Sequence, residues 1–390
     1  MTPAARVQAA IQILDAILDG DHAEKALTRW ARGSRFAGSK DRAAVRDHVF
    51  QALRCLRSQS VLGGIQTGRG LLLGELREAG VDPETLFTGI GHAPTPLSVE
   101  ELASPRAFAS AAEACDIPDW LWPFWERSLG AEAEDAAKAL RQRAPTHLRV
   151  NLRKSNREAA IQKLAAEGIV AEPHAASASA LDVTEGARKI RNCESYLSGV
   201  VELQDAASQG VVDTLPLKAG QRVLDYCAGG GGKTLAMAGR ADLALFAHDA
   251  EPRRMKDLAE RAQRAGVSVT CLSSQEVQKA APFDLVLCDA PCSGSGSWRR
   301  DPEGKWRLTQ AHLDEVTRIQ AEILDTASQL VAEGGTLAYA TCSMLDVENH
   351  LQRDAFLSRH PGWDVLSDAA WHVHSGTDGF YVCLFQRTAA

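Results

Sequence analysis

The chain has 390 residues and a formal net charge of -7, and 45% of its residues are hydrophobic and 24% charged. This composition is typical of a globular protein, and the length is sufficient for two or three domains. It has no run of 18 uninterrupted apolar residues to span a membrane and no secretory signal pattern at its N-terminus, so we expect a cytoplasmic protein without membrane contact. The nine cysteines include no Cys-x-x-Cys pair, which argues against a disulfide framework and against a zinc or other metal site.

Residues 1–135 are predicted to form an all-α domain. Apolar residues recur at helical spacing in 5–20 and again in 39–58, and Gly20 ends the first of these segments. Eight basic residues lie between Arg29 and Arg57 against two acidic ones. This run is either an ordinary solvated face or an RNA-contacting one.

Residues 136–203 are predicted to form a small α+β unit. A strand of alternating apolar and polar residues is expected over 147–153. A helix is expected within 156–169, ending at Gly168. A second basic run extends from Arg141 to Arg157. Two such runs in an acidic protein favour contact with a polyanion.

Residues 204–390 alternate regularly between apolar strands and amphipathic helices. The expected strands are 222–227, 243–249, 267–272, 284–290 and 335–342, and the expected helices are 233–240, 251–266 and 309–334. This alternation predicts βαβ units and a doubly wound, mostly parallel α/β sheet. In such sheets ligands bind at the carboxyl ends of the strands.

Four consecutive glycines follow the first of these strands. One interpretation is a phosphate-binding loop, but that motif needs a glycine at the position of Cys227, so the run does not match it. A second interpretation is a flexible turn that binds no ligand. The favoured interpretation is the S-adenosylmethionine turn of a Rossmann-like methyltransferase, in which glycines let the backbone approach the cofactor. Asp249, past the second strand, would accept the ribose hydroxyls, the alternative being that it only caps the next helix.

Two cysteines, Cys292 and Cys342, follow the fourth and fifth strands and are therefore expected at the cofactor face. The C5 carbon of a pyrimidine base becomes nucleophilic when a thiolate adds to C6, so methyl transfer to C5 needs such a cysteine. It also needs a group that binds the base and a base or release catalyst. Cys342, Asp289 and Cys292 can fill these three roles.

The segments LDYCAGGGGKT, DAPCSGSGSWRRDPEGKW and YATCSMLDVEN, in this order, closely resemble the RsmB/Sun family of RNA cytosine-C5 methyltransferases. The resemblance covers about 145–390. It implies that Cys342 is the C6 nucleophile, that Cys292 assists product release, and that Asp289 contacts both the base and the cofactor, with Lys233 as its charge partner. The residues implied to bind S-adenosylmethionine are Cys227, Ala228, Gly229, Gly230, Gly231, Gly232, Lys233, Asp249 and Asp289.

Two features depart from the family pattern. Gly230 stands where the family usually has a proline, so a more flexible turn and a lower cofactor affinity are expected. After the third strand, Ser273 and Ser274 stand where the family usually offers an acidic residue beside the adenine. The adenine contact is therefore left unassigned.

The helical N-terminus resembles the NusB-like RNA-binding domain of the same family, and residues 136–203 would be an RRM-like unit. These resemblances imply a monomeric enzyme that methylates cytosine C5 in RNA, with small-subunit ribosomal RNA as the expected substrate. Transfer RNA is the alternative substrate, and a non-catalytic RNA-binding assembly factor is the alternative function. Near the Pro-Cys loop, side chains between Trp298 and Trp306 would either contact RNA or simply pack in the fold.

Overall fold

The structure, a computed structural model, describes residues 1–103 and 105–388 and divides into two compact units. Unit 1 comprises Met1–Glu126, Gly130–Arg143 and Trp298–Leu308, and unit 2 comprises the rest. The predicted catalytic domain, 204–390, is therefore interrupted, because residues 298–308 belong to the helical unit. Within the described residues, every helix is too short or too polar to cross a lipid bilayer.

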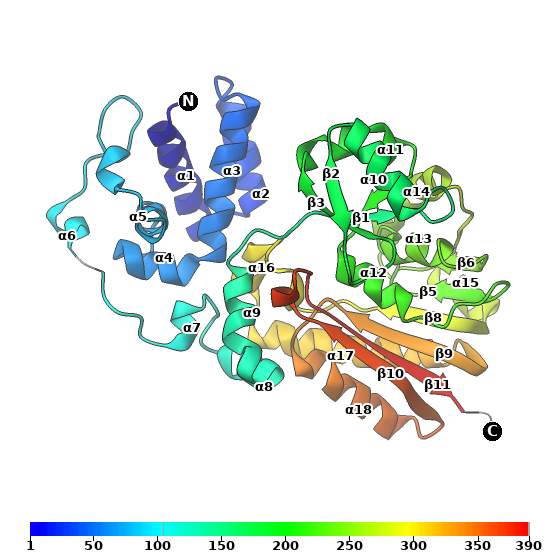
Figure 1. The fold of residues 1–390 in the computed structure, drawn as a ribbon. Helices are drawn as coiled ribbons and strands as arrows, with labels where there is room; N and C mark the ends of the chain where they lie inside the picture. The colour runs from blue at the N-terminus through cyan, green and yellow to red at the C-terminus, as the bar shows by residue number, and fades with distance from the viewer. Residues whose placement is uncertain (104, 389–390) are drawn as a thin grey trace. The chain divides into compact units, whose positions relative to one another are not determined.

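Residues 1–103 and 105–143 form helices joined by loops, with no strand, and are coloured from blue to blue-green in Figure 1. The helices are α1 (Pro3–Leu18), α2 (Ala23–Gly33), α3 (Ser39–Arg54), α4 (Leu56–Gly63), α5 (Gly68–Glu78), α6 (Val99–Leu102), α7 (Ala111–Ala114), α8 (Trp122–Leu129) and α9 (Ala133–Leu140), with short 3-10 turns η1 (Pro83–Thr85) and η2 (Gly130–Glu132). The apolar stripes of α1, α3 and α5 face one another in a common core. The periodicity thus predicted the helices and their buried faces.

The predicted helix 39–58 is in fact two helices that meet at Cys55. The carboxylate of Asp116 accepts hydrogen bonds from the backbone N–H groups of Arg57 and Ser58, at 2.8 and 2.9 Å. It also accepts the Ser58 hydroxyl at 2.7 Å. A side chain distant in sequence therefore satisfies the first N–H groups of α4, which residue periodicity alone does not reveal.

Residues 298–308, with helix α16 (Pro302–Arg307), are a packed part of unit 1. Trp298 is buried and stacks on Trp125 with ring centroids 6.1 Å apart. The indole N–H of Trp306 donates to the carbonyl of Leu53 at 2.6 Å. The structure thus favours the packing alternative for this segment over RNA contact.

Lys305 of α16 is buried, and its ammonium donates to the carbonyl of Arg54 at 3.2 Å. Burial lowers the pKa of Lys305 to about 8. At pH values between about 8 and the higher pKa of a lysine in the unfolded chain, the unfolded state binds more protons than the folded state. The contribution of Lys305 to the free energy of unfolding therefore increases as the pH rises through this range.

We expect the free energy of unfolding of the wild type to rise relative to that of Lys305→Met by about 1–2 kcal/mol between pH 8 and pH 10. Urea denaturation followed by tryptophan fluorescence at both pH values measures this difference. Lys25→Met, at an exposed lysine of α2, controls for the loss of one positive charge. Parallel profiles for wild type and Lys305→Met would contradict the prediction.

Unit 2 begins with a four-stranded antiparallel sheet of order β2-β3-β1-β4. Its elements are β1 (His147–Val150), α10 (Arg157–Ala166), β2 (Val170–Pro173), β3 (Ala180–Glu185), η3 (Ala187–Asn192), α11 (Glu194–Leu197) and β4 (Val201–Leu203). The βαββαβ order is that of an RRM-like fold. The sequence predicted β1 and α10 individually and the other strands only as short apolar pieces.

The second sheet of unit 2 has seven strands in the order β10-β11-β9-β8-β5-β6-β7. Its strands are β5 (Arg222–Asp225), β6 (Ala244–Ala247), β7 (Thr270–Cys271), β8 (Phe283–Asp289), β9 (Val331–Thr341), β10 (Trp363–Trp371) and β11 (Phe380–Arg387). All neighbours from β7 to β9 are parallel, whereas β11 runs antiparallel to β9 and β10. The predicted Rossmann-like fold class is confirmed.

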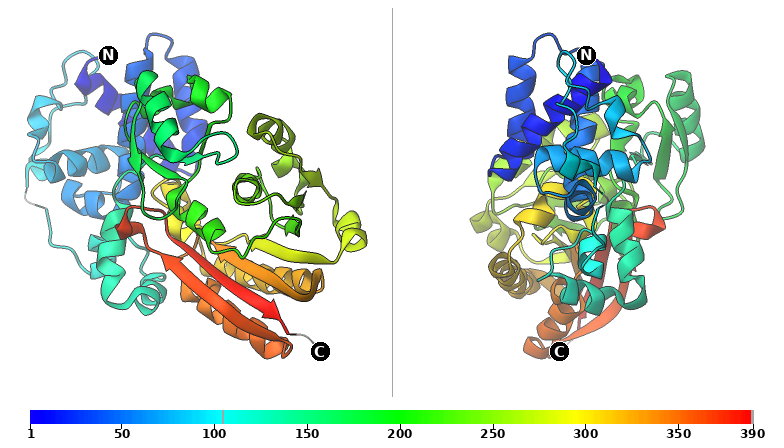
Figure 2. Two further views of the ribbon diagram at one scale, coloured as in Figure 1. Left: turned by 45° about the vertical axis from the view of Figure 1, so that its right-hand side comes forward. Right: turned by 90° about the vertical axis from the view of Figure 1, so that its left-hand side faces the viewer.

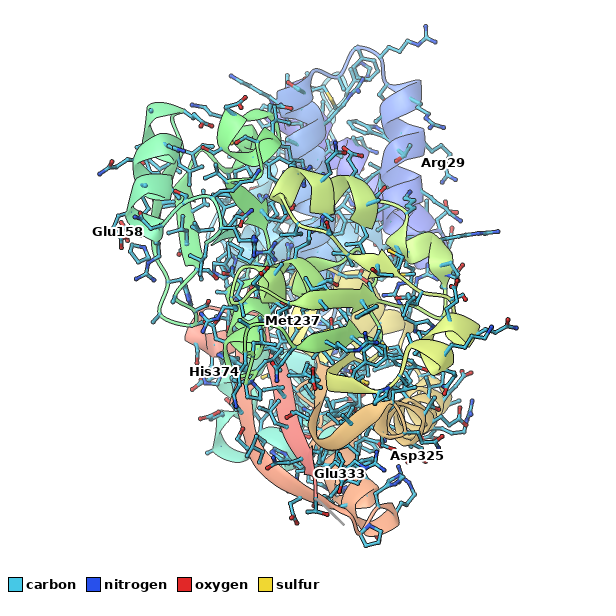
Figure 3. All side chains as sticks on the ribbon, turned by 90° about the vertical axis from the view of Figure 1, so that its right-hand side faces the viewer. Arg29, Glu158, Met237, Asp325, Glu333 and His374 are labelled. Carbon is cyan, nitrogen blue, oxygen red and sulfur yellow. The ribbon has the colours of Figure 1, made fainter. Side chains whose placement is uncertain are left out.

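Helices cover both faces of this sheet. The helices and 3-10 turns of this part of the chain are α12 (Ala206–Asp213), α13 (Gly232–Ala238), η4 (Pro252–Met255), α14 (Leu258–Ala265), α15 (Ser274–Ala280), η5 (Ser295–Ser297), α17 (Gln310–Ser328), η6 (Asp346–Glu348), α18 (His350–Arg359) and η7 (Val373–Ser375). Leu285 and Leu287 of β8 face a cluster with α12 and α13, whereas Val286 and Cys288 face a cluster with α17 and α18. Met237, labelled in Figure 3, is buried in the first cluster.

Strands β10 and β11 were not predicted. They form a hairpin at the end of the chain, drawn in red beside β9 in Figure 2. The predicted helix 309–334 also extends too far, because α17 ends at Ser328 and β9 begins at Val331. Apolar residues flank this junction on both sides, and local pattern does not mark where the helix ends.

Candidate active site

The glycine loop connects β5, which ends at Asp225, to α13, which begins at Gly232. Gly229 and Gly231 have φ angles of +50° and +78°, in the left-handed region that favours glycine. A Cβ atom at Gly231 would lie 2.1 Å from Cδ1 of the buried Leu258. Both backbone conformation and close packing therefore require glycine at position 231.

Asp249 lies beside this loop and is only 4% exposed. Its Oδ2 accepts the Gly229 N–H and its Oδ1 accepts the Glu251 N–H, both at 2.9 Å. The second bond lies just before η4, as in the capping role considered for Asp249, whereas its role in binding the ribose hydroxyls stays a prediction. The two bonds fix the carboxylate at the carboxyl end of β6.

Asp225 is fully buried below the loop. Its Oδ2 accepts the hydroxyl of Thr234 at 2.6 Å, whereas its Oδ1 is buried without a hydrogen-bond partner among the described residues. Burial raises the pKa of Asp225 to about 7. Such an oxygen is satisfied either by a hydrogen-bond donor or by protonation of the carboxyl, which the raised pKa favours.

Two arginines hold the carbonyl groups of the glycine loop. Arg149 of β1 donates to the Gly232 carbonyl at 2.7 Å, and Arg261 of α14 donates to the Gly230 carbonyl. Burial lowers the pKa of Arg149 to about 10. Neither contact was predicted, because both residues are distant from the loop in the chain.

Lys233, the first residue after the glycines, is buried next to Asp289 at the end of β8. Its ammonium nitrogen lies 2.7 Å from Asp289 Oδ2 and 4.7 Å from the centroid of the Phe380 ring. The structure therefore brings together the cofactor loop and the predicted base-binding carboxylate. Of the other loop residues, Cys227 has a pKa raised well above that of an ordinary thiol by burial, as expected for a small apolar side chain.

The two predicted catalytic cysteines lie side by side. Cys292 follows β8, Cys342 follows β9, and their sulfur atoms are 3.4 Å apart. A hydrogen bond from the Cys292 thiol lowers the pKa of Cys342, and the same contact raises the pKa of Cys292. These opposite shifts make Cys342 the cysteine of the pair that ionises more readily.

Glu348, which was not singled out from the sequence, joins the two cysteine loops. Its buried carboxylate accepts the backbone N–H and the hydroxyl of Ser293, at 2.7 and 2.5 Å, and also the hydroxyl of Ser343. Ser293 follows Cys292 and Ser343 follows Cys342. A carboxylate five residues after a Thr-Cys-Ser segment is the sequence signal that could have identified it.

Glu348→Gln should lower the free energy of unfolding by about 1–3 kcal/mol, because an amide cannot accept all the hydrogen bonds that the carboxylate receives. Urea denaturation measures the effect. Glu322→Gln, at an exposed glutamate of α17, is the matched control and should change stability by less than about 0.5 kcal/mol. Equal stabilities of the two variants would contradict the assigned role.

The segment after β7 supplies no free carboxylate for an adenine ring. Ser273 caps α15 together with Glu276, and the hydroxyl of Ser274 lies 2.9 Å from Nε2 of His248. These side chains are thus engaged in local structure, and the adenine contact stays unassigned.

Comparison with known proteins gives two family matches and a set of named relatives. Residues 212–383 match the family described as 16S rRNA methyltransferase RsmB/F, and residues 117–188 match the ferredoxin-like domain of RsmF/B-like methyltransferases. The ribosomal RNA small subunit methyltransferase B of Serratia proteamaculans is 35% identical over 249 residues, or 62% of this chain and 58% of its own length. That of Vibrio cholerae is 34% identical over 283 residues, or 69% and 65%. The chain thus spans about 60% of the length of these relatives.

Crystal structures share the fold. That of PH0851 superposes with a TM-score of 0.76 at 23% identity and covers 99% of each chain. NSun6 from Pyrococcus horikoshii superposes with a TM-score of 0.62 at 17% identity over 70% of this chain and 99% of its own. The identities are low enough that these two structures support the fold alone. The sequence matches go further, because residues 212–383, which make up most of the Rossmann-like domain, match the family described as 16S rRNA methyltransferase RsmB/F.

Proposed function

We propose that this chain is an S-adenosylmethionine-dependent methyltransferase that modifies C5 of a cytosine in small-subunit ribosomal RNA. The observation that carries the proposal is the 3.4 Å contact between the Cys292 and Cys342 sulfurs, close to the Lys233–Asp289 ion pair at the carboxyl end of β8. The names of the sequence relatives support ribosomal RNA as substrate over transfer RNA.

The residues around the glycine loop fit S-adenosylmethionine. Asp249 offers a fixed carboxylate for ribose hydroxyls, and Asp225 offers a buried oxygen for the ammonium group. When bound, the cofactor supplies an electrophilic methyl group. NSun6, with the same fold, was crystallised with SFG, an analogue of this cofactor.

The chain's own groups would activate the base. The Cys342 thiolate forms a bond to C6, and the electron pair of the C5–C6 double bond moves onto C5, which then accepts the methyl group. The Asp289 carboxylate accepts a hydrogen bond from the exocyclic amine, which cytosine has and uracil lacks. The C5 proton then leaves to a base and the double bond re-forms.

Release breaks the bond between C6 and the Cys342 sulfur, which departs with the electron pair. Cys292, 3.4 Å away, donates a hydrogen bond to the departing thiolate. The target nucleotide must be unpaired or flipped out of a helix, because a stacked base does not expose C6 to a thiolate.

The proposal is tested by incubating the full chain with tritiated S-adenosylmethionine and small-subunit ribosomal RNA or transfer RNA from a strain lacking the gene. Label in the ribosomal RNA, mapped to one cytosine by bisulfite sequencing, is the expected result. Label in transfer RNA alone would overturn the assigned substrate. Cofactor binding without transfer to either RNA would favour the non-catalytic alternative.

A further inference from the structure

The loop between α2 and α3 presents an unusual surface, which we call the Phe36 patch. It consists of Arg32, Arg35, Phe36 and Lys40, all of them exposed, and Phe36 is 75% exposed. An aromatic ring this far out of the core does not contribute to folding through burial. Its position among three cations therefore calls for another explanation.

The loop itself is well defined. Ala37, next to Phe36, is buried, and its N–H donates to the Ser34 carbonyl at 3.0 Å. Arg42 donates to the Ala37 carbonyl at 3.0 Å, and the Gly38 N–H donates to Asp41 at 3.1 Å. The backbone thus directs Ala37 inward and leaves Phe36 outside.

The positive charge of the patch is not neutralised locally. Of the acidic residues nearby, Asp21 pairs with Arg29, Glu24 with Arg46, and Asp41 with Arg6 and the N-terminus. Figure 3 labels Arg29 on α2. Within the part of the chain that the structure describes, Arg32, Arg35 and Lys40 have no carboxylate within ion-pair distance.

The two arginines at the other end of the basic run, Arg54 and Arg57, are structural. Arg54 is buried and donates to the Arg299 carbonyl at 2.9 Å. Arg57 forms a bidentate ion pair with Asp119, with hydrogen bonds of 2.8 and 2.9 Å. Only the loop end of this run therefore offers free cations together with an aromatic face.

We propose that the Phe36 patch binds unpaired RNA, with one base stacked on Phe36 and the neighbouring phosphates on Arg32, Arg35 and Lys40. Stacking on an exposed ring requires a base whose face is free, as in single strands and loops but not within a duplex. Lysine and arginine around the ring supply the phosphate contacts. The choice of RNA rests on the proposed function, and the patch gives that enzyme a second contact with its substrate.

The test measures binding of the full chain to a fluorescein-labelled, unstructured RNA of about 15 nucleotides, a length suited to single-strand sites. Phe36→Ala should weaken binding about tenfold or more, and Phe36→Trp should restore it, because both aromatic rings stack. An RNA duplex of equal length should bind the wild type and Phe36→Ala with the same affinity, because its bases are already stacked. Phe108→Ala, at another exposed phenylalanine of unit 1, is the matched control.

The charges are tested by salt dependence. Arg35→Gln and Lys40→Gln should each reduce the slope of log affinity against log salt by about 0.7, the value for one phosphate contact on a single strand. Arg318→Gln, at an exposed arginine of α17 that pairs with Glu322, controls for net charge and should leave the slope unchanged. Equal slopes for all variants would overturn the phosphate contacts.

Other outcomes separate this proposal from the proposed function. If the wild type methylates ribosomal RNA while Phe36→Ala binds single strands as tightly as wild type, the patch proposal fails and the function stands. If the wild type methylates neither RNA but binds single strands more tightly than Phe36→Ala does, the proposed function fails and the patch proposal stands. Competition by poly-glutamate as strong as by RNA would show a general anion-binding surface and overturn the assignment to RNA.

Discussion

Replacement of Cys342 by alanine is expected to abolish methylation of RNA while changing the affinity for S-adenosylmethionine by less than about twofold. The reason is that the Cys342 sulfur is the group that would bond to C6 in the proposed mechanism. Cys342 is hydrogen-bonded by Cys292, which lowers its pKa, whereas the pKa of Cys292 is raised. Tritium transfer and isothermal titration measure the two quantities.

Cys292→Ala is expected to give the opposite signature, a covalent complex between protein and RNA that survives denaturing gel electrophoresis. Without the Cys292 thiol, the departing Cys342 thiolate loses its hydrogen-bond donor, so the adduct accumulates. The same loss raises the pKa of Cys342, so the acidic limb of adduct formation should move to higher pH.

Cys271→Ala, at an exposed cysteine of β7 outside the site, serves as control and should behave like the wild type. An adduct formed by Cys342→Ala but not by Cys292→Ala would reverse the two roles. Methylation by both variants at the wild-type rate would remove the cysteines from the mechanism.

The parts of the fold that were predictable from sequence are those with strong local periodicity. The parallel strands β5, β6 and β8 are short apolar runs, and the helices between them are amphipathic, so their alternation specified a doubly wound sheet. The carboxyl ends of adjacent strands meet at one edge, so the loops with Asp289, Cys292 and Cys342 could be expected together. Their actual separation, 3.4 Å for the two sulfurs, is a tertiary result.

The contacts that sequence could not reveal are long-range ones. Arg149 and Arg261 bind carbonyls of the glycine loop from a strand of the other sheet and from α14. Residues 298–308 pack with unit 1 although they lie between catalytic segments. A basic run such as 29–57 looks uniform in sequence, whereas in the structure Arg54 and Arg57 are committed to the fold and the loop end is free.

Gly231→Ala is expected to weaken S-adenosylmethionine binding about tenfold or more and to lower stability by about 1–3 kcal/mol. An alanine would be strained at the observed φ of +78°, and its Cβ would lie 2.1 Å from Leu258 Cδ1. Leu258 is fully buried, so the loop must move instead. Isothermal titration with the cofactor and urea denaturation measure the two effects.

Gly230→Ala, the same change one residue earlier, is the matched control and should change the affinity by less than about threefold. The φ of Gly230 lies outside the left-handed region, and the nearest atom to a Cβ there is Nη1 of Arg261 at 3.0 Å, the end of a flexible side chain. Gly230→Pro, which introduces the proline usual in the family, should then tighten cofactor binding, because proline restricts the unbound loop. Weaker binding by Gly230→Pro would show that the Arg261 contact with the Gly230 carbonyl, and not the missing proline, sets the conformation of this loop.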